Sequence, residues 1–187
     1  SNTHLEGPLY VGEGSTISPL SYVTNSVIGP MCKIGGELNS VVIEGYTNKV
    51  HYGFLGNSYI GEWVNFGAGT TNSNLKNNYG KVRVQMNDEV FETNRIHLGC
   101  FIGDYVKTSI GTKINTGSVY GPGSVIFSKD FPSKNIPILT WYTDSGMSRV
   151  GIDEFILNCH RMKKRRGVDF DIVEEQFYRN LFLKVEK

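Results

Sequence analysis

Large apolar residues recur about every six positions along much of this chain, and three of them are each followed by glycine: Leu55, Ile60 and Phe66. A six-residue period fits one short strand and one tight corner, with the apolar side chain inward and a small residue turning the backbone. One repeat cannot bury its apolar face alone, so the coils must stack as a solenoid. The inward positions are Val11, Ile17, Val23, Ile28, Ile34, Ile43, Lys49, Leu55, Ile60, Ile102, Thr108, Ile114, Tyr120 and Ile126.

His51 lies outside this inward series. Lys49 holds the inward position two residues earlier, so the His51 side chain falls between inward positions and is expected to face outward. Pro19 and Pro30 follow inward positions, where the chain leaves the strand. The pattern predicts a repeat structure and not an ordinary β-sandwich.

Residues 71–95 interrupt the period and contain residues that favour turns. Within them, Lys81-Val-Arg-Val alternates like a short strand. We interpret residues 5–130 as one β-helix from which residues 71–95 protrude as a loop. A long loop on a rigid scaffold is often functional or interfacial.

The pattern changes again after the solenoid, which we expect to close near Lys129. Residues 131–148 have no period and should form an extended segment over the solenoid surface. Residues 149–187 show helical spacing, with Gly167 as a stop and Asp171 and Glu174 as a capping box before a second helix. The two helices would cap the solenoid edge or contact a neighbouring subunit. Their predicted apolar stripes are Phe155, Ile156, Cys159 and Met162, and then Val173, Phe177, Leu181 and Val185.

Composition excludes several classes of protein. The net charge of +1 gives no global electrostatic case for nucleic acid or an anionic membrane, and no apolar run is long enough to span a bilayer. Three unpaired cysteines, Cys32, Cys100 and Cys159, favour reduced thiols in a cytoplasmic, soluble protein. Residues 1–2 are typical of a cleaved tag, and a chain that begins almost inside a repeat is expected to be a fragment.

Specific motifs resemble the left-handed β-helix domain of the bifunctional glucosamine-1-phosphate acetyltransferase and uridylyltransferase family. They are similar above all to its branch of sugar-phosphate nucleotidyltransferases. The resemblance covers roughly residues 5 to 185 and supplies the handedness, which the period alone does not define. The matching residues are Gly45-Tyr-Thr-Asn-Lys-Val-His-Tyr-Gly-Phe-Leu-Gly-Asn-Ser58, Gly61-Glu-Trp63 and Ser73-Asn-Leu-Lys-Asn-Asn-Tyr79.

The resemblance implies a homotrimer that binds acetyl-CoA between neighbouring prisms and acetylates an amino sugar phosphate similar to glucosamine 1-phosphate. The family's catalytic histidine falls on His51, its substrate-contacting aromatic residue on Phe54, and its asparagines on Asn65 and Asn74. Ala68 matches a residue near the thioester. The family's nucleotidyltransferase domain has a phosphate loop that is absent here, so Mg²⁺ is expected only with that missing domain.

The chemistry agrees with these roles. Acetyl transfer needs an uncharged amine, and a histidine with a pKa of about 6.5 suits the removal of its proton. Backbone amides of Gly67, Ala68 and Gly69 could hold the oxyanion. The alternative is that His51 is a surface imidazole and that the Gly-Ala-Gly-Thr sequence is only a corner.

Phosphate recognition departs from the family pattern. The region around Asn39 and Ser40 is neutral, and Thr24 or a neighbour stands where an arginine is expected. Lys49, Lys81 or Arg83 could substitute, and the prediction names Lys81. Asp104 also replaces the usual serine beside the thioester, and the C-terminal helices replace a basic tail that helps to hold coenzyme A.

Other functions stay open. The solenoid could be a trimerisation module, or a regulatory module that binds a sugar nucleotide, without any catalysis. A trimeric zinc hydratase would need clustered histidines, whereas His4, His51, His97 and His160 are scattered, so no metal site is predicted. Residues 161–166 form a basic run whose default role is a solvated helix end, with coenzyme A phosphates as a second possibility.

Overall fold

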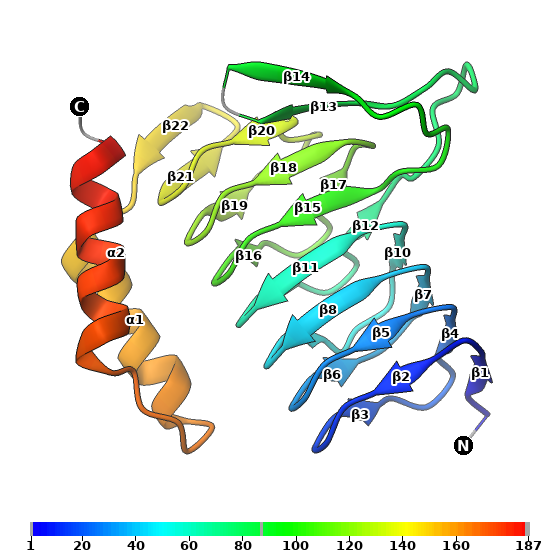
Figure 1. The fold of residues 1–187 in the computed structure, drawn as a ribbon, viewed down its shortest axis with the longest axis horizontal. Coiled ribbons are helices and arrows are strands. Elements are labelled where there is room, and N and C mark those ends of the chain that lie inside the picture. The colour runs from blue at the N-terminus through cyan, green and yellow to red at the C-terminus, as the bar shows by residue number, and fades with distance from the viewer. Residues whose placement is uncertain (1, 87, 186–187) are drawn as a thin grey trace.

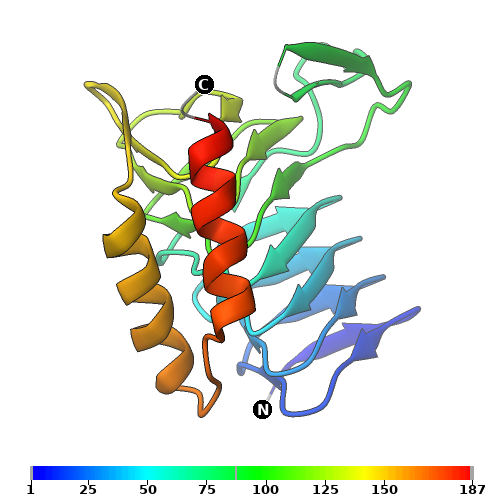
Figure 2. The ribbon, with the colours of Figure 1, turned by 60° about the vertical axis from the view of Figure 1, so that its left-hand side comes forward.

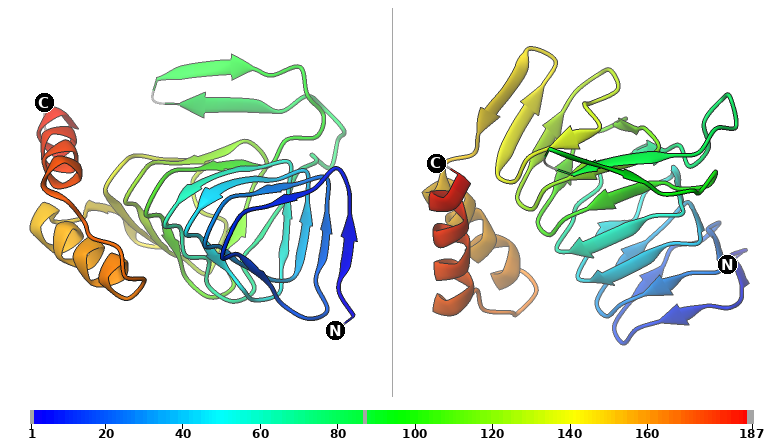
Figure 3. Two further views of the ribbon diagram at one scale, coloured as in Figure 1. Left: turned by 60° about the horizontal axis from the view of Figure 1, so that its bottom comes forward. Right: turned by 45° about the horizontal axis from the view of Figure 1, so that its top comes forward.

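The computed structural model describes residues 2–86 and 88–185, and it shows a parallel β-solenoid followed by two helices (Figure 1). The solenoid has about eight turns, and its short strands stack into three faces of a prism (Figure 3). Parallel ladders join each coil to the next, as in the pairing of Leu38 with Leu55. This architecture confirms the predicted fold class and is consistent with a left-handed β-helix.

The three faces are named here in chain order. Face 1 contains β1 (His4–Glu6), β4 (Tyr22–Thr24), β7 (Glu37–Asn39), β10 (Phe54–Gly56), β12 (Thr71–Asn72) and β17 (Lys113–Ile114). Face 2 contains β2 (Tyr10–Val11), β5 (Val27–Ile28), β8 (Val42–Gly45), β11 (Tyr59–Glu62), β15 (Cys100–Ile102), β18 (Ser118–Tyr120) and β20 (Asn135–Ile136). Face 3 contains β3 (Thr16–Ile17), β6 (Lys33–Ile34), β9 (Asn48–Lys49), a bridge at Asn65, β16 (Lys107–Thr108), β19 (Val125–Phe127), β21 (Thr140–Thr143) and β22 (Gly146–Arg149).

The inward positions predicted from the period form the core of the prism. All are buried except Val11 and Ile17, which lie in the first coil and have no full coil below them. Leu38, from a stretch that the period had left irregular, is also fully buried in this core. The period therefore identified most of the inward strand positions, and β7 added Leu38. The other core residues outside the predicted list are Cys32, Val41, Val64, Phe66, Cys100, Val106 and Ile136.

The edges of the prism require unusual backbone angles. Asn25, Ser40 and Asn57 have positive φ values of 48°, 58° and 46° at successive corners between faces 1 and 2. Asparagine tolerates this left-handed conformation better than most residues. We call this column, which continues to Asn74, the asparagine edge.

Residues 131–148 do not lie over the surface as expected. β20 pairs with β18 and β21 pairs with β19, both in parallel, so this segment adds a further coil to the solenoid. β22 then reverses and pairs antiparallel with β21. The proline-rich sequence hid this coil because its buried residues, Ile136 and Leu139, lack the six-residue spacing.

The loop predicted at residues 71–95 is shorter than expected at its start. Thr71 and Asn72 still belong to the solenoid as β12, which pairs with β17. The protruding part is an antiparallel hairpin of β13 (Arg83–Met86) and β14 (Glu89–Glu92) that stands off the prism (Figure 3). Val82 and Val84 are buried at its base, so side-chain packing holds the hairpin to the rest of the structure.

The two helices lie side by side along the edge between faces 2 and 3 (Figure 2). α1 spans Ile152–Lys164 and α2 spans Ile172–Val185. The stripe predicted for α1 is confirmed, because Phe155, Ile156 and Cys159 are buried. The stripe predicted for α2 is confirmed only at Leu181.

Two residues of the stripe predicted for α2 face away from the solenoid, and two residues outside the stripe face it. Val173 is 71% exposed and Phe177 is 58% exposed, whereas Tyr178 is buried and Leu181 and Phe182 are half-buried. The side chain of Val185 lies outside the described residues. Tertiary contacts chose the aromatic face of this helix, because Tyr105 of the solenoid offers Tyr178 an edge-to-face contact at 5.5 Å.

Only half of the predicted capping box forms. The Asp171 carboxylate accepts hydrogen bonds from the amides of Val173 and Glu174, at 2.9 Å and 2.8 Å, as an N-cap should. The Glu174 side chain does not return to the cap. It binds the Tyr105 hydroxyl and the buried Lys163 ammonium instead, and so joins α2, α1 and the solenoid.

Lys49 is the one charged residue among the predicted inward positions. Its side chain is 3% exposed, and its Nζ donates hydrogen bonds to the carbonyls of Gly35 at 3.0 Å and His51 at 2.9 Å. Burial lowers the pKa of the Lys49 ammonium to about 8. Between that value and the ordinary 10.5, the unfolded chain binds more protons than the folded chain. The contribution of Lys49 to the free energy of unfolding should therefore rise with pH across this window.

Lys49→Met should abolish this rise. Between about pH 7.5 and 9.5, we expect the free energy of unfolding of the unsubstituted protein to increase by roughly 2 kcal/mol relative to the variant, measured by urea unfolding. The variant is the reference because burial also raises the pKa of Cys32, Cys100 and Cys159, and of Tyr105, Tyr120 and Tyr178. Ionisation of these groups in the unfolded chain favours unfolding of both proteins as the pH rises. Parallel pH profiles for the two proteins would contradict the assignment.

Candidate functional site

His51 and the Gly67–Gly69 corner stack on the same edge of the prism, between faces 3 and 1. The amide of Gly69 donates to the carbonyl of Tyr52 at 3.2 Å, which places the two corners on adjacent coils. His51 is exposed, and Ala68 is half-buried. We call this column the histidine edge, and it contains residues 51–53, 67–70 and 109–111.

The solenoid leaves one amide of the Gly67–Gly69 corner available. Gly67 donates to the Thr108 carbonyl at 3.1 Å, and Gly69 donates to Tyr52. Within the described chain, the Ala68 amide has no recorded partner, although the Ala68 carbonyl accepts from Gly111 at 2.8 Å. The oxyanion role predicted for three amides is therefore open to Ala68 alone.

Face 1 carries two further predicted site residues at the next coil positions. Phe54 lies in β10, and its ring covers Gly56, where an added Cβ would lie 2.3 Å from the ring. The Asn74 amide borders the same spot at 2.9 Å and donates to Asn57 at 2.6 Å. Because Gly56 has no side chain, the Phe54 ring and the Asn74 amide can both occupy the space above it. Phe54 therefore lies on face 1 between His51 at one edge and Asn74 at the other.

Two predicted residues lie elsewhere. Asn65 belongs to face 3, where it accepts a hydrogen bond from Asn48 at 2.9 Å, and it lines a groove beneath α1. Lys81 stands at the base of the hairpin, where its Nζ donates to Asn94 at 2.8 Å. The structure therefore does not bring Asn65 or Lys81 beside His51 within one chain.

The structure also changes which basic residues could bind the substrate phosphate. Lys49 is buried inside the prism and cannot reach a ligand. Arg83 lies in the hairpin, 3.9 Å from Glu92. Lys113 is the cation that sequence reasoning missed on face 1: it pairs in register with Thr71, which bonds to Phe54. Two strand spacings, about 10 Å, separate Lys113 from Phe54 along the face.

The four histidines remain apart. His4 stacks on Tyr22 at 4.6 Å, and His160 pairs with Glu175 at 3.5 Å. In residues 2–86 and 88–185, no three His, Cys, Asp or Glu side chains are placed to hold a metal ion. The same part of the chain contains no helix long and apolar enough to cross a membrane.

Comparison with known proteins agrees with the fold and the motifs. No family model matches the chain. It is 38% identical over 104 residues to a bifunctional sugar-1-phosphate nucleotidylyltransferase/acetyltransferase of Sulfurisphaera tokodaii, which covers 50% of this chain and 25% of that protein. It is 30% identical over 139 residues to the bifunctional protein GlmU of Pseudomonas paraeruginosa, covering 73% of this chain and 28% of that protein.

The homologues of this chain are GlmU-type bifunctional proteins. A further GlmU, from Azoarcus sp., is 24% identical over 148 residues, which cover 68% of this chain and 30% of that protein. The aligned regions lie in the C-terminal part of these relatives and span between a quarter and a third of their length. The predicted resemblance to the GlmU family is thus confirmed as homology.

The histidine edge depends on close backbone approach at Gly67. A Cβ added there would lie 2.4 Å from the carbonyl carbon of Ser109 on the next coil. We expect Gly67→Ala to force the two coils apart and to lower the free energy of unfolding by about 1–3 kcal/mol, measured by urea unfolding.

Gly80→Ala is the matched control, because its Cβ would meet only the movable Asn78 side chain, at 3.1 Å. This change should stay within about 0.5 kcal/mol. Equal effects of the two substitutions would contradict the close approach at Gly67.

Proposed function

We propose that the chain is an acetyltransferase-like domain that transfers acetyl from acetyl-CoA to an amino sugar phosphate along the histidine edge. The observation that supports this most is the stacking of exposed His51 and half-buried Ala68 on adjacent coils of one edge. Homology to bifunctional nucleotidyltransferase/acetyltransferases agrees with this chemistry. The substrate is therefore of the glucosamine 1-phosphate class.

His51 acts as the general base in this proposal. As the amine nitrogen attacks the thioester carbonyl and the C–N bond forms, the imidazole accepts a proton from that nitrogen. The C–S bond then breaks, and the imidazolium returns the proton to the sulfur, so that the coenzyme leaves as a thiol. His51 is held in place through its backbone, since its carbonyl accepts a hydrogen bond from buried Lys49. The Ala68 amide would donate to the oxygen that becomes negative.

Face 1 would hold the sugar phosphate. Phe54 offers an aromatic ring to the sugar, and Asn74 offers an amide at the far side of the face. Lys113 supplies the positive charge, because it lies on the same face and its Nζ is held 5.3 Å from the centre of the Phe131 ring. The last residues of β4 and β7 are neutral, and there Asn39 donates a hydrogen bond to Thr24 at 2.9 Å.

A homotrimer in the cytoplasm completes the proposal. The outward side chains of face 2 form an apolar ladder in register, from Tyr10 through Val27 and Val42 to Tyr59, each at least 39% exposed. Such a ladder favours burial against another protein surface. The nucleotidyltransferase activity, with its Mg²⁺, is proposed only for a whole protein of the bifunctional kind. The chain aligns with only 25–30% of the length of the S. tokodaii and Azoarcus proteins.

Calorimetry with acetyl-CoA, with and without glucosamine 1-phosphate, tests this function first. We expect saturable binding that weakens in Ala68→Trp, because the indole would fill the histidine edge. Acetyl transfer should fall by about 10²- to 10⁴-fold in His51→Ala, with the thermal midpoint unchanged. His160→Ala, an exposed histidine on α1, is the matched control and should keep its activity.

The opposite result would favour an assembly module. A folded, trimeric sample that neither binds acetyl-CoA at millimolar concentration nor acetylates the sugar would overturn the acetyltransferase proposal. Lys113→Gln should raise KM for the sugar phosphate with kcat unchanged, which is the outcome expected for a phosphate contact.

A further inference from the structure

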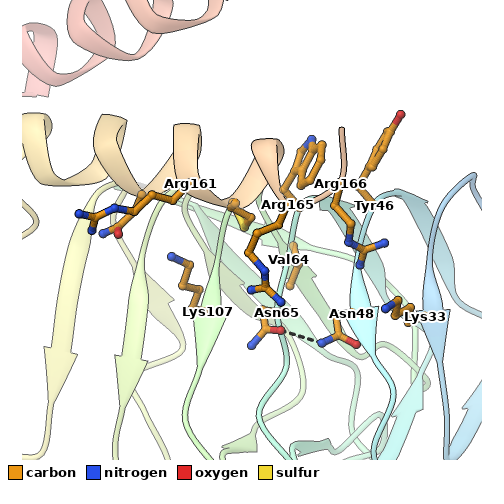
Figure 4. A pocket seen from close by; sticks show the side chains of 12 residues that line it. Lys33, Tyr46, Asn48, Val64, Asn65, Lys107, Arg161, Arg165 and Arg166 are labelled. Atoms are coloured by element: carbon orange, nitrogen blue, oxygen red, sulfur yellow. Dashed lines mark hydrogen bonds between the residues drawn. The ribbon is translucent and has the colours of Figure 1, made fainter. Parts of the chain in front are cut away.

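A groove of about 380 Å³ lies between α1 and face 3, away from the histidine edge (Figure 4). Strands of face 3 form its floor, and the C-terminal half of α1 forms its wall. Among the described residues, no Asp or Glu lines it. Its charged lining residues are all cations: Lys33, Lys107, Arg161, Arg165 and Arg166.

These five cations have no carboxylate partners among the described residues. The ion pairs of this region use other side chains, as in Lys163 with Glu174. Arg166 donates to the Met31 carbonyl at 3.2 Å, which positions the guanidinium without neutralising it. Several like charges gathered in one concave site favour the binding of an anion.

The dipole of α1 does not account for the whole set. Cations are stabilised near the C-terminus of a helix, which covers Arg161 and the residues just beyond Lys164. Lys33 and Lys107, however, come from β6 and β16, and nothing in the helix selects positive charge there. The solenoid and the helix each contribute cations to the same space.

The floor of the groove adds neutral polar groups. The Asn48 amide donates to the Asn65 oxygen at 2.9 Å, whereas the Asn48 oxygen is buried and has no partner among the described residues. A buried acceptor without a donor is costly unless a ligand or water satisfies it. A hydroxyl group on the ligand would supply that donor.

We propose that this groove binds a phosphate ester with at least two phosphate groups and a free hydroxyl, the chemistry shared by nucleoside diphosphates, nucleotide sugars and coenzyme A. One phosphate monoester carries a charge of about −1.5 to −2, so five cations exceed what a single phosphate would neutralise. The volume falls within the range of about 300–1,000 Å³ that is usual for small-molecule sites. Arginine forks suit phosphate oxygens.

This site does not rest on acetyl transfer. His51 and residues 67–69 are not in its lining, whereas Asn65 is, so the substrate role predicted for Asn65 moves to this groove. His51→Ala should leave ligand binding in the groove unchanged. The two proposals can therefore fail separately.

Binding is measured with inorganic pyrophosphate, ADP, UDP-glucose and coenzyme A, by calorimetry and by tryptophan emission. The chain has two tryptophans, and Trp63 lines the groove, so Trp141→Phe leaves one reporter. We expect saturable binding with one site per chain that weakens as salt is raised. Preference for coenzyme A would identify an acyl donor as the source, and preference for ADP or UDP-glucose would identify a nucleotide or sugar nucleotide.

Matched variants locate the site. Arg165→Gln and Lys107→Gln, from the helix and the strand, should each weaken binding by about tenfold. Lys164→Gln removes the same charge from the residue just before Arg165, which lies outside the lining, and should change affinity by less than about twofold. Asn48→Ala should weaken ADP and UDP-glucose but leave pyrophosphate unchanged, because pyrophosphate has no hydroxyl for the Asn48 oxygen.

Thermal midpoints of all variants are measured first, and binding is compared only among folded proteins. The absence of saturable binding for all four probes at millimolar concentration would overturn the proposal. Equal losses in Arg165→Gln, Lys107→Gln and Lys164→Gln would also overturn it, because they would show a diffuse charge effect.

Discussion

Backbone stacking between successive coils is the constraint on which the rest of this structure depends. Each coil donates its amides to the carbonyls of the coil beside it, so the corners must approach closely and repeat in register. Inward side chains have only a narrow prism to fill, and Ile34, Leu55 and Ile60 fill it almost without exposure. Outward side chains do not have to fill the prism, so only they are available to bind ligands or to catalyse a reaction.

The three edges use this freedom in different ways. The asparagine edge satisfies its own side chains, as in Asn74 with Asn57, and it is polar but uncharged. The histidine edge keeps an exposed imidazole and one available amide on adjacent coils. The third edge carries Tyr46, Trp63 and Tyr105, which stack on one another and receive the helices. The three edges of one scaffold thus carry different chemistry.

Helix docking at the third edge depends on a small polar cluster within an aromatic one. Glu174 binds both Tyr105 and Lys163, and burial raises the pKa of the Tyr105 hydroxyl. Because Glu174 is the third residue of α2, the helix start is tied to the solenoid itself. The same docking holds the end of α1 over face 3, and so the groove exists only because the helices are seated here.

The sequence by itself determined the solenoid, the inward positions, the outward direction of His51 and the N-cap at Asp171, because each follows from local periodicity or local hydrogen bonding. Tertiary structure decided what depends on distant partners. It added residues 131–148 to the solenoid as a coil, through pairing with β18 and β19. It turned Tyr178 inward in place of Phe177, and it gathered Lys33, Lys107 and Arg165 around one groove. These three cations are separated by many residues, and only the path of the folded chain brings them together.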